Sequence, residues 1–336
     1  MHDNDKIPPM FSLPLWPERA SLAALKIAKL KRAIPFTNQH RCRASRGGGG
    51  KRQSASSERW LTRQRKDQYV KAAQKEGLPS RAIFKLEQID QMIPSLSSNK
   101  GGAEREGIFH RNGQVVIDLG AYPGGWSVYV SQQIGSTGVA VAVDLLELDS
   151  VTKSALLHKY PARFIPIQGD FRTKKVKEDI LRHLRPLVSD NDAAYGDEVP
   201  SRLSSSSASN TSTRWHVADV VLSDMAANFT GDQHTDALRT MSLCEDALMY
   251  AIGSSCFDPS ATVPQQQQEE RHWTETGVLK SGGTFLCKYF SCGKEHEKDL
   301  LEAARRQFVN VDIVKPPSSR RESAEKYLLA RGFRGK

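Results

Sequence analysis

From Val115 onward, short apolar runs alternate with stretches of helical character, and this alternation constrains the fold more than any other feature of the chain. Runs rich in Val, Ile, Leu and Phe predict buried strands, and the stretches between them are long enough for crossover helices. We therefore expect an α/β fold with a doubly wound, mainly parallel, seven-stranded sheet and helices on both faces. The predicted strands are Val115–Leu119, Val139–Asp144, Phe164–Gln168, Val217–Ser223, Thr284–Tyr289, Val309–Val314 and Tyr327–Ala330.

A glycine-rich turn, DLGAYPGGW at residues 118–126, follows the first predicted strand. Glycine there lets the backbone turn sharply and approach a ligand closely. The second predicted strand ends at Asp144, whose carboxylate can accept hydrogen bonds from a ribose diol, and the third is followed by Gly169 and Asp170. The chain lacks both the GxGxxG spacing of dinucleotide-binding proteins and a GxxxxGK[ST] phosphate loop. This order of motifs is typical of Rossmann-like class I methyltransferases and favours S-adenosylmethionine over NAD as the cofactor.

Four ionisable residues are candidates for acid–base chemistry. Lys288 lies at the centre of an apolar predicted strand, where an ammonium group is unfavourable unless it has a partner or a function. Lys85 lies among apolar residues on a predicted helix. Asp224 closes the fourth predicted strand, at the edge where ligands bind in open α/β sheets, and Glu325 opens the last strand. A lysine can take a proton from a hydroxyl when burial or a neighbouring cation favours its neutral amine.

Eight segments resemble, in order, the motifs of the FtsJ (RrmJ) family of RNA 2′-O-methyltransferases, and most closely its mitochondrial large-subunit rRNA branch. The resemblance covers residues 51–333 apart from the insertions described below. The segments are RQSASSERWL (52–61), SRAIFKL (80–86), DLGAYPGGW (118–126), VDLLELD (143–149), QGDFR (168–172), LSDMAAN (222–228), FLCKYF (285–290) and KPPSSR (315–320). The resemblance implies that the family's Lys-Asp-Lys-Glu tetrad falls on Lys85, Asp224, Lys288 and Glu325. It also implies cofactor contacts at Gly124, Trp126, Asp144, Asp170 and Asp224, to which we add Gly125 from the glycine-rich turn.

The reaction implied by the resemblance is attack of a ribose 2′-oxygen on the methyl group of S-adenosylmethionine. Lys288 would accept the hydroxyl proton, and Asp224 would hold Lys288 in place. Lys85 would favour the neutral amine of Lys288 by like-charge repulsion, and Glu325 would orient the two lysines or the hydroxyl. No metal is required.

Two positions depart from the family pattern, and one assignment has an alternative. Tyr122 stands where bacterial members usually have Ala, and Ala227 replaces the usual Pro. Neither change removes a reacting group. Glu322, three residues before Glu325, is the alternative for the last acid of the tetrad.

The amino-terminal arm is strongly basic. Residues 19–52 contain ten Lys or Arg and no acidic residue, a composition that resembles a mitochondrial presequence. We therefore expect residues 1–50 to be an arm that targets the protein to the mitochondrial matrix, and 51–336 to be one methyltransferase domain. The alternative is a basic arm that binds nucleic acid, in a protein of the nucleus or cytoplasm. Polar, low-complexity segments near 97–107, 190–213 and 258–276 predict loop insertions.

The composition of the chain also indicates which class of partner it binds. The formal net charge of +10 favours a polyanion, and with the resemblance it predicts ribosomal RNA or a large ribosomal subunit precursor. No run of 18 or more apolar residues occurs, so we expect no membrane span. Five cysteines without CxxC spacing predict reduced thiols, and we expect a monomer. The alternative functions are methylation of tRNA or nucleolar pre-rRNA, and ribosome assembly through RNA binding alone.

Overall fold

The computed structural model describes residues 62, 65–96, 107–192, 216–253 and 277–335. All of them belong to one compact unit, Ser56–Lys336. The predicted targeting arm at 1–50 lies outside the described residues, as do nearly all of the predicted insertions near 97–107, 190–213 and 258–276. Residues 190–192 are an exception, because they form the last turn of a helix.

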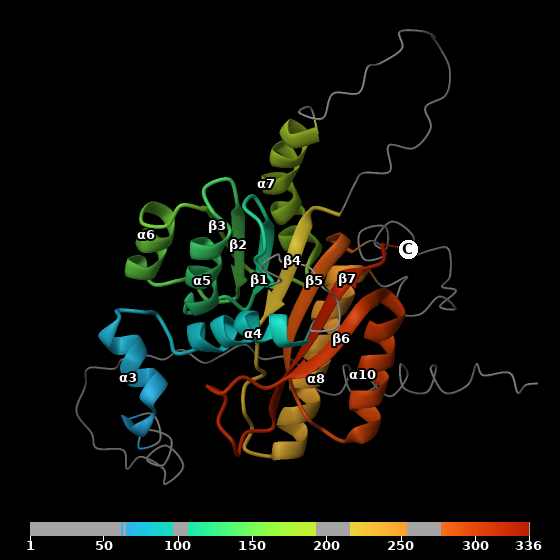
Figure 1. The fold of residues 1–336 in the computed structure, drawn as a ribbon. Helices are drawn as coiled ribbons and strands as arrows, with labels where there is room; N and C mark the ends of the chain where they lie inside the picture. The colour runs from blue at the N-terminus through green and yellow to red at the C-terminus, as the bar shows by residue number, and fades with distance from the viewer. Residues whose placement is uncertain (1–61, 63–64, 97–106, 193–215, 254–276, 336) are drawn as a thin grey trace, which may run out of the picture. The chain divides into compact units, whose positions relative to one another are not determined.

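The sheet has the seven strands that the sequence predicts (Figure 1). Its order is β3-β2-β1-β4-β5-β7-β6; β7 runs antiparallel to both β5 and β6, and the other neighbouring strands are parallel. The order reverses between β1 and β4, which is where open α/β sheets bind ligands. The bounds are β1 Val115–Leu119, β2 Val139–Asp144, β3 Arg163–Gln168, β4 Ala218–Ser223, β5 Leu279–Phe290, β6 Phe308–Val314 and β7 Glu325–Phe333.

Helices cover both faces of the sheet, as predicted, and each face has its own apolar core. Helices α4, α5 and α6 pack on one face, and α7, α8 and α10 pack on the other. Helix α3 is short and amphipathic, and precedes α4. The bounds are α3 Gln68–Lys75, α4 Ile83–Leu96, α5 Gly125–Gln133, α6 Ser150–His158, α7 Lys174–Asp192, α8 Gln233–Ile252 and α10 Lys294–Gln307.

Strand β5 is longer than the predicted Thr284–Tyr289 and begins at Leu279. The sequence prediction missed this start because Ser281, Gly282 and Gly283 interrupt the apolar run. The pairing of β4 with β5 shifts register between Ala218 and Val220, which accommodates the added residues as a bulge-like irregularity.

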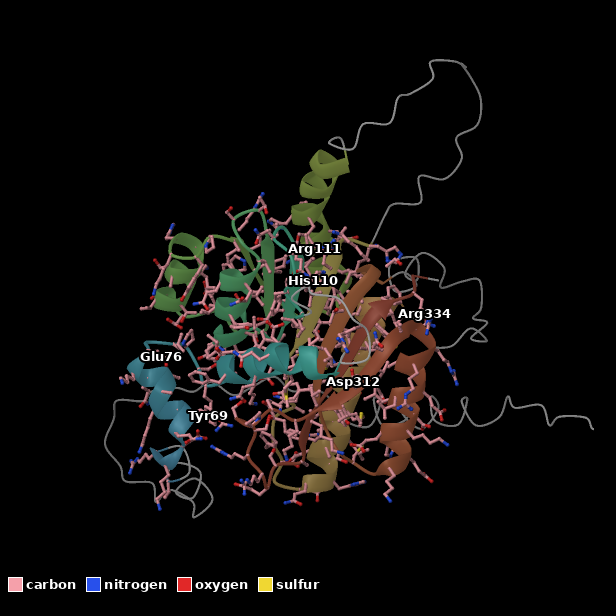
Figure 2. The ribbon with its side chains drawn as sticks, in the orientation of Figure 1. Tyr69, Glu76, His110, Arg111, Asp312 and Arg334 are labelled. Atoms are coloured by element: carbon pink, nitrogen blue, oxygen red, sulfur yellow. The ribbon has the colours of Figure 1, made fainter. Side chains whose placement is uncertain are left out.

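The amino-terminal edge of the sheet is held by a buried carboxylate. Asp219 Oδ1 lies 2.5 Å from Arg111 Nη2, and Asp219 Oδ2 lies 3.2 Å from Lys280 Nζ and 2.8 Å from Val115 N. Arg111 is labelled in Figure 2, next to His110. These contacts tie β1, β4 and β5 together at the edge opposite the candidate site, so we read Asp219 as structural. Among the described residues, no helix is long and apolar enough to cross a membrane.

Candidate active site

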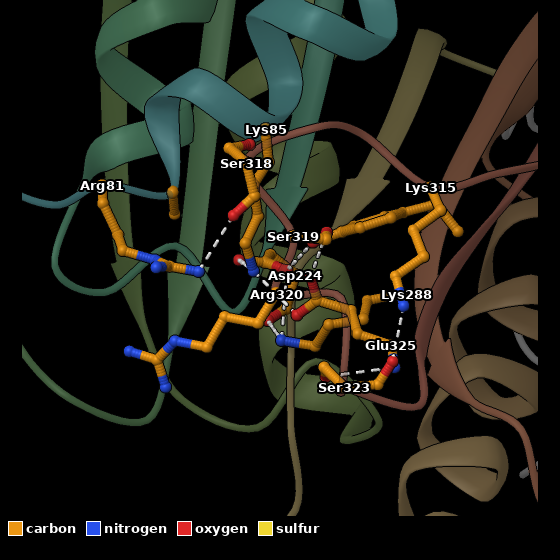
Figure 3. A network of polar contacts seen from close by, with 12 residues as sticks. Arg81, Lys85, Asp224, Lys288, Lys315, Ser318, Ser319, Arg320, Ser323 and Glu325 are labelled. Carbon is orange, nitrogen blue, oxygen red and sulfur yellow. Dashed lines mark hydrogen bonds and ion pairs between the residues drawn. The ribbon is translucent and has the colours of Figure 1, made fainter. Parts of the chain in front are cut away.

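The four residues of the predicted tetrad lie together at the carboxyl ends of the central strands (Figure 3). Lys85 comes from the first turn of α4, Asp224 follows β4, Lys288 lies near the end of β5, and Glu325 is the first residue of β7. Lys288 Nζ lies 3.1 Å from Asp224 Oδ1 and donates to the backbone oxygen of Asp224 at 2.5 Å. Lys85 Nζ lies 2.8 Å from Glu325 Oε2 and 3.9 Å from Asp224 Oδ2. Asp224 is therefore the residue that both lysines contact.

These charges are largely withdrawn from solvent, because Lys85 and Lys288 are each 7% exposed and Glu325 is 8% exposed. Burial alone would raise the pKa of the Asp224 carboxyl. The positive charges of Lys288 and Lys85, with hydrogen bonds from Tyr327 and Lys288, outweigh burial and hold that pKa below its usual value. Asp224 is therefore an anion at neutral pH, and the cluster contains two carboxylates facing two amines.

Tyr327 belongs to this cluster, although the sequence reasoning did not single it out. Its hydroxyl donates to Asp224 Oδ1 at 2.8 Å, and its ring lies 5.8 Å from Lys85 Nζ. Burial, with the nearby negative charges of Asp224 and Glu325, raises the pKa of Tyr327 well above its usual value, so the phenol keeps its proton. Strand alternation could have identified it: Tyr327 lies two residues after Glu325 on β7, so the two side chains lie on the same face of the sheet.

Ser319 is a second contact that the sequence reasoning did not single out. Its buried hydroxyl donates to Glu325 Oε1 at 2.6 Å, so the two carboxylate oxygens of Glu325 are bound by Ser319 and Lys85. Glu325 is thus fixed from both sides. Glu322, the alternative acid, is exposed. The geometry therefore favours Glu325 over Glu322 as the acid of this cluster.

The KPPSSR segment (315–320) forms hydrogen bonds and ion pairs with residues at the starts of α3 and α4. Arg81 Nη2 donates to the Ser318 backbone oxygen at 3.1 Å, and its other terminal nitrogen pairs with Asp67. Arg320 Nη2 lies 3.3 Å from the same carboxylate oxygen of Asp67. Asp67 is also the N-cap of α3, where it accepts from the backbone of Tyr69 and Val70. One carboxylate therefore links α3, the turn before α4 and the segment that carries Ser319.

A cavity of about 210 Å³ lies at the carboxyl ends of β1, β2 and β3, beside the glycine-rich turn. Ala121, Leu148 and Ile167 contribute apolar wall, and Asp144 and Gln168 contribute polar groups. The Asp144 carboxylate accepts from Tyr122 N at 2.9 Å and from Leu146 N at 2.8 Å, which fixes its position and leaves acceptor capacity. Burial raises the pKa of Asp144 above its usual value, and these backbone hydrogen bonds oppose the rise. Apolar walls with a carboxylate suit the base and the sugar hydroxyls of a nucleoside.

Gly124 and Gly125, two of the other predicted cofactor residues, lie in this turn, where neighbouring side chains pack against their backbone. Gly124 has φ 107°, and a Cβ there would lie 2.6 Å from Thr152 Cγ2, so α6 packs directly against the turn. A Cβ at Gly125 would collide with the Ser80 hydroxyl, so this glycine admits the segment leading into α4. The two glycines therefore allow close packing of α6 and of the segment before α4, and Ala121 is the residue of this turn that lines the cavity.

Trp126 and Asp170 have partners within the protein. The Trp126 indole is 3% exposed, donates to the Ala82 backbone oxygen at 2.9 Å, and packs against Tyr327 with ring centroids 5.9 Å apart. Its side chain therefore connects the cofactor turn to the tetrad. Asp170 forms a two-oxygen hydrogen-bonded pair with Arg172, and it is not among the residues lining the cavity. At the end of β3 the cavity wall is Gln168 instead.

Within the described ranges, no group of three or more His, Cys, Asp and Glu side chains is arranged to hold a metal ion.

Comparison with known proteins assigns the family. A family model described as FtsJ-like methyltransferase matches residues 78–333. The protein named "Ribosomal RNA large subunit methyltransferase E" of Bradyrhizobium diazoefficiens is 36% identical over 290 residues, covering 85% of this chain and 92% of its own length. The protein of the same name in Granulibacter bethesdensis is 37% identical over 284 residues, covering 84% of this chain and 88% of its own. Among solved structures, Aeropyrum pernix fibrillarin with S-adenosyl-L-methionine aligns with a TM-score of 0.31 and 14% identity, over 66% of this chain and 67% of that one. The chain belongs to the FtsJ-like methyltransferases, enzymes whose methyl donor is S-adenosylmethionine.

Proposed function

We propose that this enzyme methylates a ribose 2′-hydroxyl of large-subunit ribosomal RNA. The observation that carries the proposal is the contact geometry of Lys288, whose nitrogen is held by two acceptors on one residue, Asp224. The names of the relatives support ribosomal RNA as the substrate class.

The hydrogen bonds of Lys288 suit a base. A neutral primary amine has two N–H donors and one lone pair. The backbone oxygen and Oδ1 of Asp224, at 2.5 and 3.1 Å from Nζ, can take both N–H groups. The lone pair is then available to accept the proton of a ribose hydroxyl. Lys85 contacts two carboxylates, those of Glu325 and Asp224, whereas Lys288 contacts that of Asp224 alone.

The remaining residues hold this arrangement. Asp224 fixes the direction of the Lys288 amine and stabilises the ammonium that forms when it takes the proton. Glu325 and Asp224 share Lys85, and the Tyr327 phenol donates to Asp224, so each charged group has a partner before and after proton transfer. Bound S-adenosylmethionine supplies an electrophilic methyl group, and Asp144 with the apolar walls beside it would hold its nucleoside. A water-poor site favours a reaction in which a positive charge on sulfur disappears.

A finer assignment is that the target is a uridine in the A-loop of mitochondrial large-subunit rRNA. The basic, acid-free stretch at 19–52 supports targeting to the mitochondrial matrix. A nuclear or cytoplasmic protein acting on tRNA or pre-rRNA is the alternative within the family. We test location by fusing residues 1–52 to a fluorescent reporter. Mitochondrial signal is expected, and a diffuse or nuclear signal would reject the matrix assignment.

Methyl transfer to RNA is tested directly. The protein is incubated with radiolabelled S-adenosylmethionine and an unmodified transcript of large-subunit rRNA, and 2′-O-methyl positions are mapped. We expect one ribose to be labelled by the wild-type protein, and the same ribose to be labelled roughly 10²- to 10⁴-fold more slowly by Lys288→Met. Label on a base, or no label on any RNA with folded protein, would reject the proposal. If cells that lack the protein grow poorly and Lys288→Met restores their growth fully, an assembly role that depends on RNA binding alone would be favoured instead.

A further inference from the structure

An exposed aromatic side chain lies next to the candidate active site. Phe229 is 66% exposed, and it lies five residues after Asp224 on the loop between β4 and α8. In this position the Phe229 ring forgoes most of the free energy of burial and leaves a flat apolar face open to a ligand. None of the tetrad contacts described above uses it.

Phe229 stacks on a ring that belongs to the catalytic strand. Its ring centroid lies 5.9 Å from that of Phe290, with an angle of 22° between the ring planes. Phe290 follows Lys288 by two residues on β5, so the two side chains share one face of the sheet, about 7 Å apart along the strand. In the antiparallel register Phe290 pairs directly with Glu325, and Lys288 pairs with Tyr327. The aromatic pair therefore borders the tetrad on the same face.

The loop that carries Phe229 is fixed immediately beyond it. Asp236, which is 6% exposed, accepts hydrogen bonds from Thr230 N at 2.7 Å, Thr230 Oγ1 at 2.9 Å and Gly231 N at 3.2 Å. Burial would raise the pKa of Asp236, but these hydrogen bonds outweigh it and hold the pKa below its usual value, so the carboxylate stays ionised. The backbone next to Phe229 is thus held in place by hydrogen bonds within the protein, without a bound ligand.

We propose that Phe229, supported by Phe290, is a stacking surface for a nucleobase of the RNA strand whose ribose is methylated. The inference rests on the proposed function, because a ribose placed at Lys288 brings its own base and the neighbouring bases to the border of the tetrad. A flat, exposed ring already stacked on a second ring offers a π-face of the kind that single-stranded RNA uses. The surface does not read a particular base, because stacking is tolerant of sequence. It positions the nucleotide and so sets how well RNA binds, whereas Lys288 sets how fast the bound ribose reacts.

The test compares four variants with the wild-type protein on an unmodified large-subunit rRNA transcript. They are Phe229→Ala, Phe229→Leu, Phe229→Trp and the control Val309→Ala, which removes part of an exposed apolar side chain on β6. KM for the transcript and KM for S-adenosylmethionine are measured separately, and melting temperatures are recorded. Tryptophan fluorescence of Phe229→Trp is followed as the transcript is added.

We expect Phe229→Ala and Phe229→Leu to raise KM for RNA by about fivefold to a hundredfold, with KM for S-adenosylmethionine and the melting temperature unchanged. Phe229→Trp should retain wild-type KM, and RNA should quench its fluorescence beyond the change seen with wild type. Val309→Ala should behave as wild type. Equal KM values for Phe229→Ala and wild type would overturn the stacking role. Wild-type behaviour of Phe229→Leu would also overturn it, because an apolar side chain without a π-face would then be sufficient. A wild-type protein that methylates no ribose would instead reject the proposed function itself.

Discussion

Lys85 Nζ lies 2.8 Å from Glu325 Oε2, although the two residues are 240 positions apart in the sequence. The contact joins the first turn of α4 to the first residue of β7, so the active site forms only when the two ends of the domain are assembled. A buried charge that loses its ion-pair partner is strongly destabilising, because its desolvation is no longer compensated. The pair therefore contributes to stability and to the arrangement of Asp224 and Lys288.

Replacing Lys288 separates binding from proton transfer. Lys288→Met should lower the rate at saturating RNA and cofactor by roughly 10²- to 10⁴-fold, because the proton acceptor is lost. Lys288→Arg should be equally slow, since a guanidinium keeps its proton and cannot act as a base. Affinities for RNA and S-adenosylmethionine should stay within a few fold of wild type. Single-turnover methylation checks the rate, and near-normal turnover by Lys288→Arg would reduce Lys288 to a positioning charge.

Two neighbouring acids allow the last member of the tetrad to be tested with a matched control. Glu325→Gln removes the charge that pairs with Lys85, and should lower the free energy of unfolding by about 3 to 5 kcal/mol along with most of the activity. Glu322→Gln changes an exposed acid on the same segment, and should stay within about 0.5 kcal/mol of wild type. Urea unfolding and methyl-transfer assays measure both. If Glu322→Gln were the damaging substitution, the assignment of Glu325 would be wrong.

The strands, and the unusual position of Lys288 within one of them, were predictable because their signals are local. Apolar periodicity marks β1 to β7 to within a few residues at most ends, and a lysine in an apolar strand marks Lys288 without any knowledge of its partners. The order of strand-end motifs also placed Asp144 at the edge of the sheet where the structure has a cavity.

The partners of these residues were not predictable in the same way. Glu325 was expected to orient the two lysines or the hydroxyl, but the sequence did not indicate that it would pair closely with Lys85, a contact that depends on how β7 pairs with β5. Asp170 stays a predicted cofactor contact, and its hydrogen-bonded pair with Arg172 was not indicated by the sequence. Periodicity does not fix strand register or the direction of a side chain at a strand end, so such contacts need the assembled fold.

The buried carboxyl of Asp118 should give the protein a measurable pH dependence. Burial raises the pKa of Asp118 to about 7 from its ordinary value of 3.8, and the hydrogen bond from Ser127 at 2.7 Å opposes that rise. Between these two pH values the folded state holds a proton that the unfolded state has released. Stability therefore falls as the pH rises through this window, by a total on the order of 4 kcal/mol, and then levels off. Asp118→Asn should lack this component.

Urea unfolding of wild type and Asp118→Asn at pH 5 and pH 8 measures the effect. The variant should gain stability relative to wild type as the pH is raised. Parallel pH profiles for the two proteins would show that Asp118 does not titrate in this range.

The basic residues before and on α3 should contribute RNA affinity without contributing to chemistry. Lys66, Lys71 and Lys75 are exposed, and they have the composition of a phosphate-contacting surface, whereas Arg59 and Arg63 lie outside the described residues. Each lost phosphate contact should reduce the slope of log affinity against log salt by about 0.7 to 0.9. Replacing all three lysines by Gln should therefore weaken RNA binding and flatten its salt dependence by about two units. Methyl transfer at saturating RNA should remain.

Two comparisons separate this electrostatic role from a structural one. The matched control replaces Lys294, Lys298 and Arg305 of α10 by Gln, and it should leave the salt slope unchanged if the effect belongs to the α3 surface rather than to net charge. Arg320 and Arg321 provide the second comparison. Arg320 pairs with Asp67 at 3.3 Å, whereas Arg321 is exposed. Arg320→Ala should lower the melting temperature as well as RNA affinity, and Arg321→Ala should lower affinity alone. Equal salt slopes for the two lysine triples would show that α3 holds no dedicated phosphate contacts, and the RNA would have to bind elsewhere on the domain.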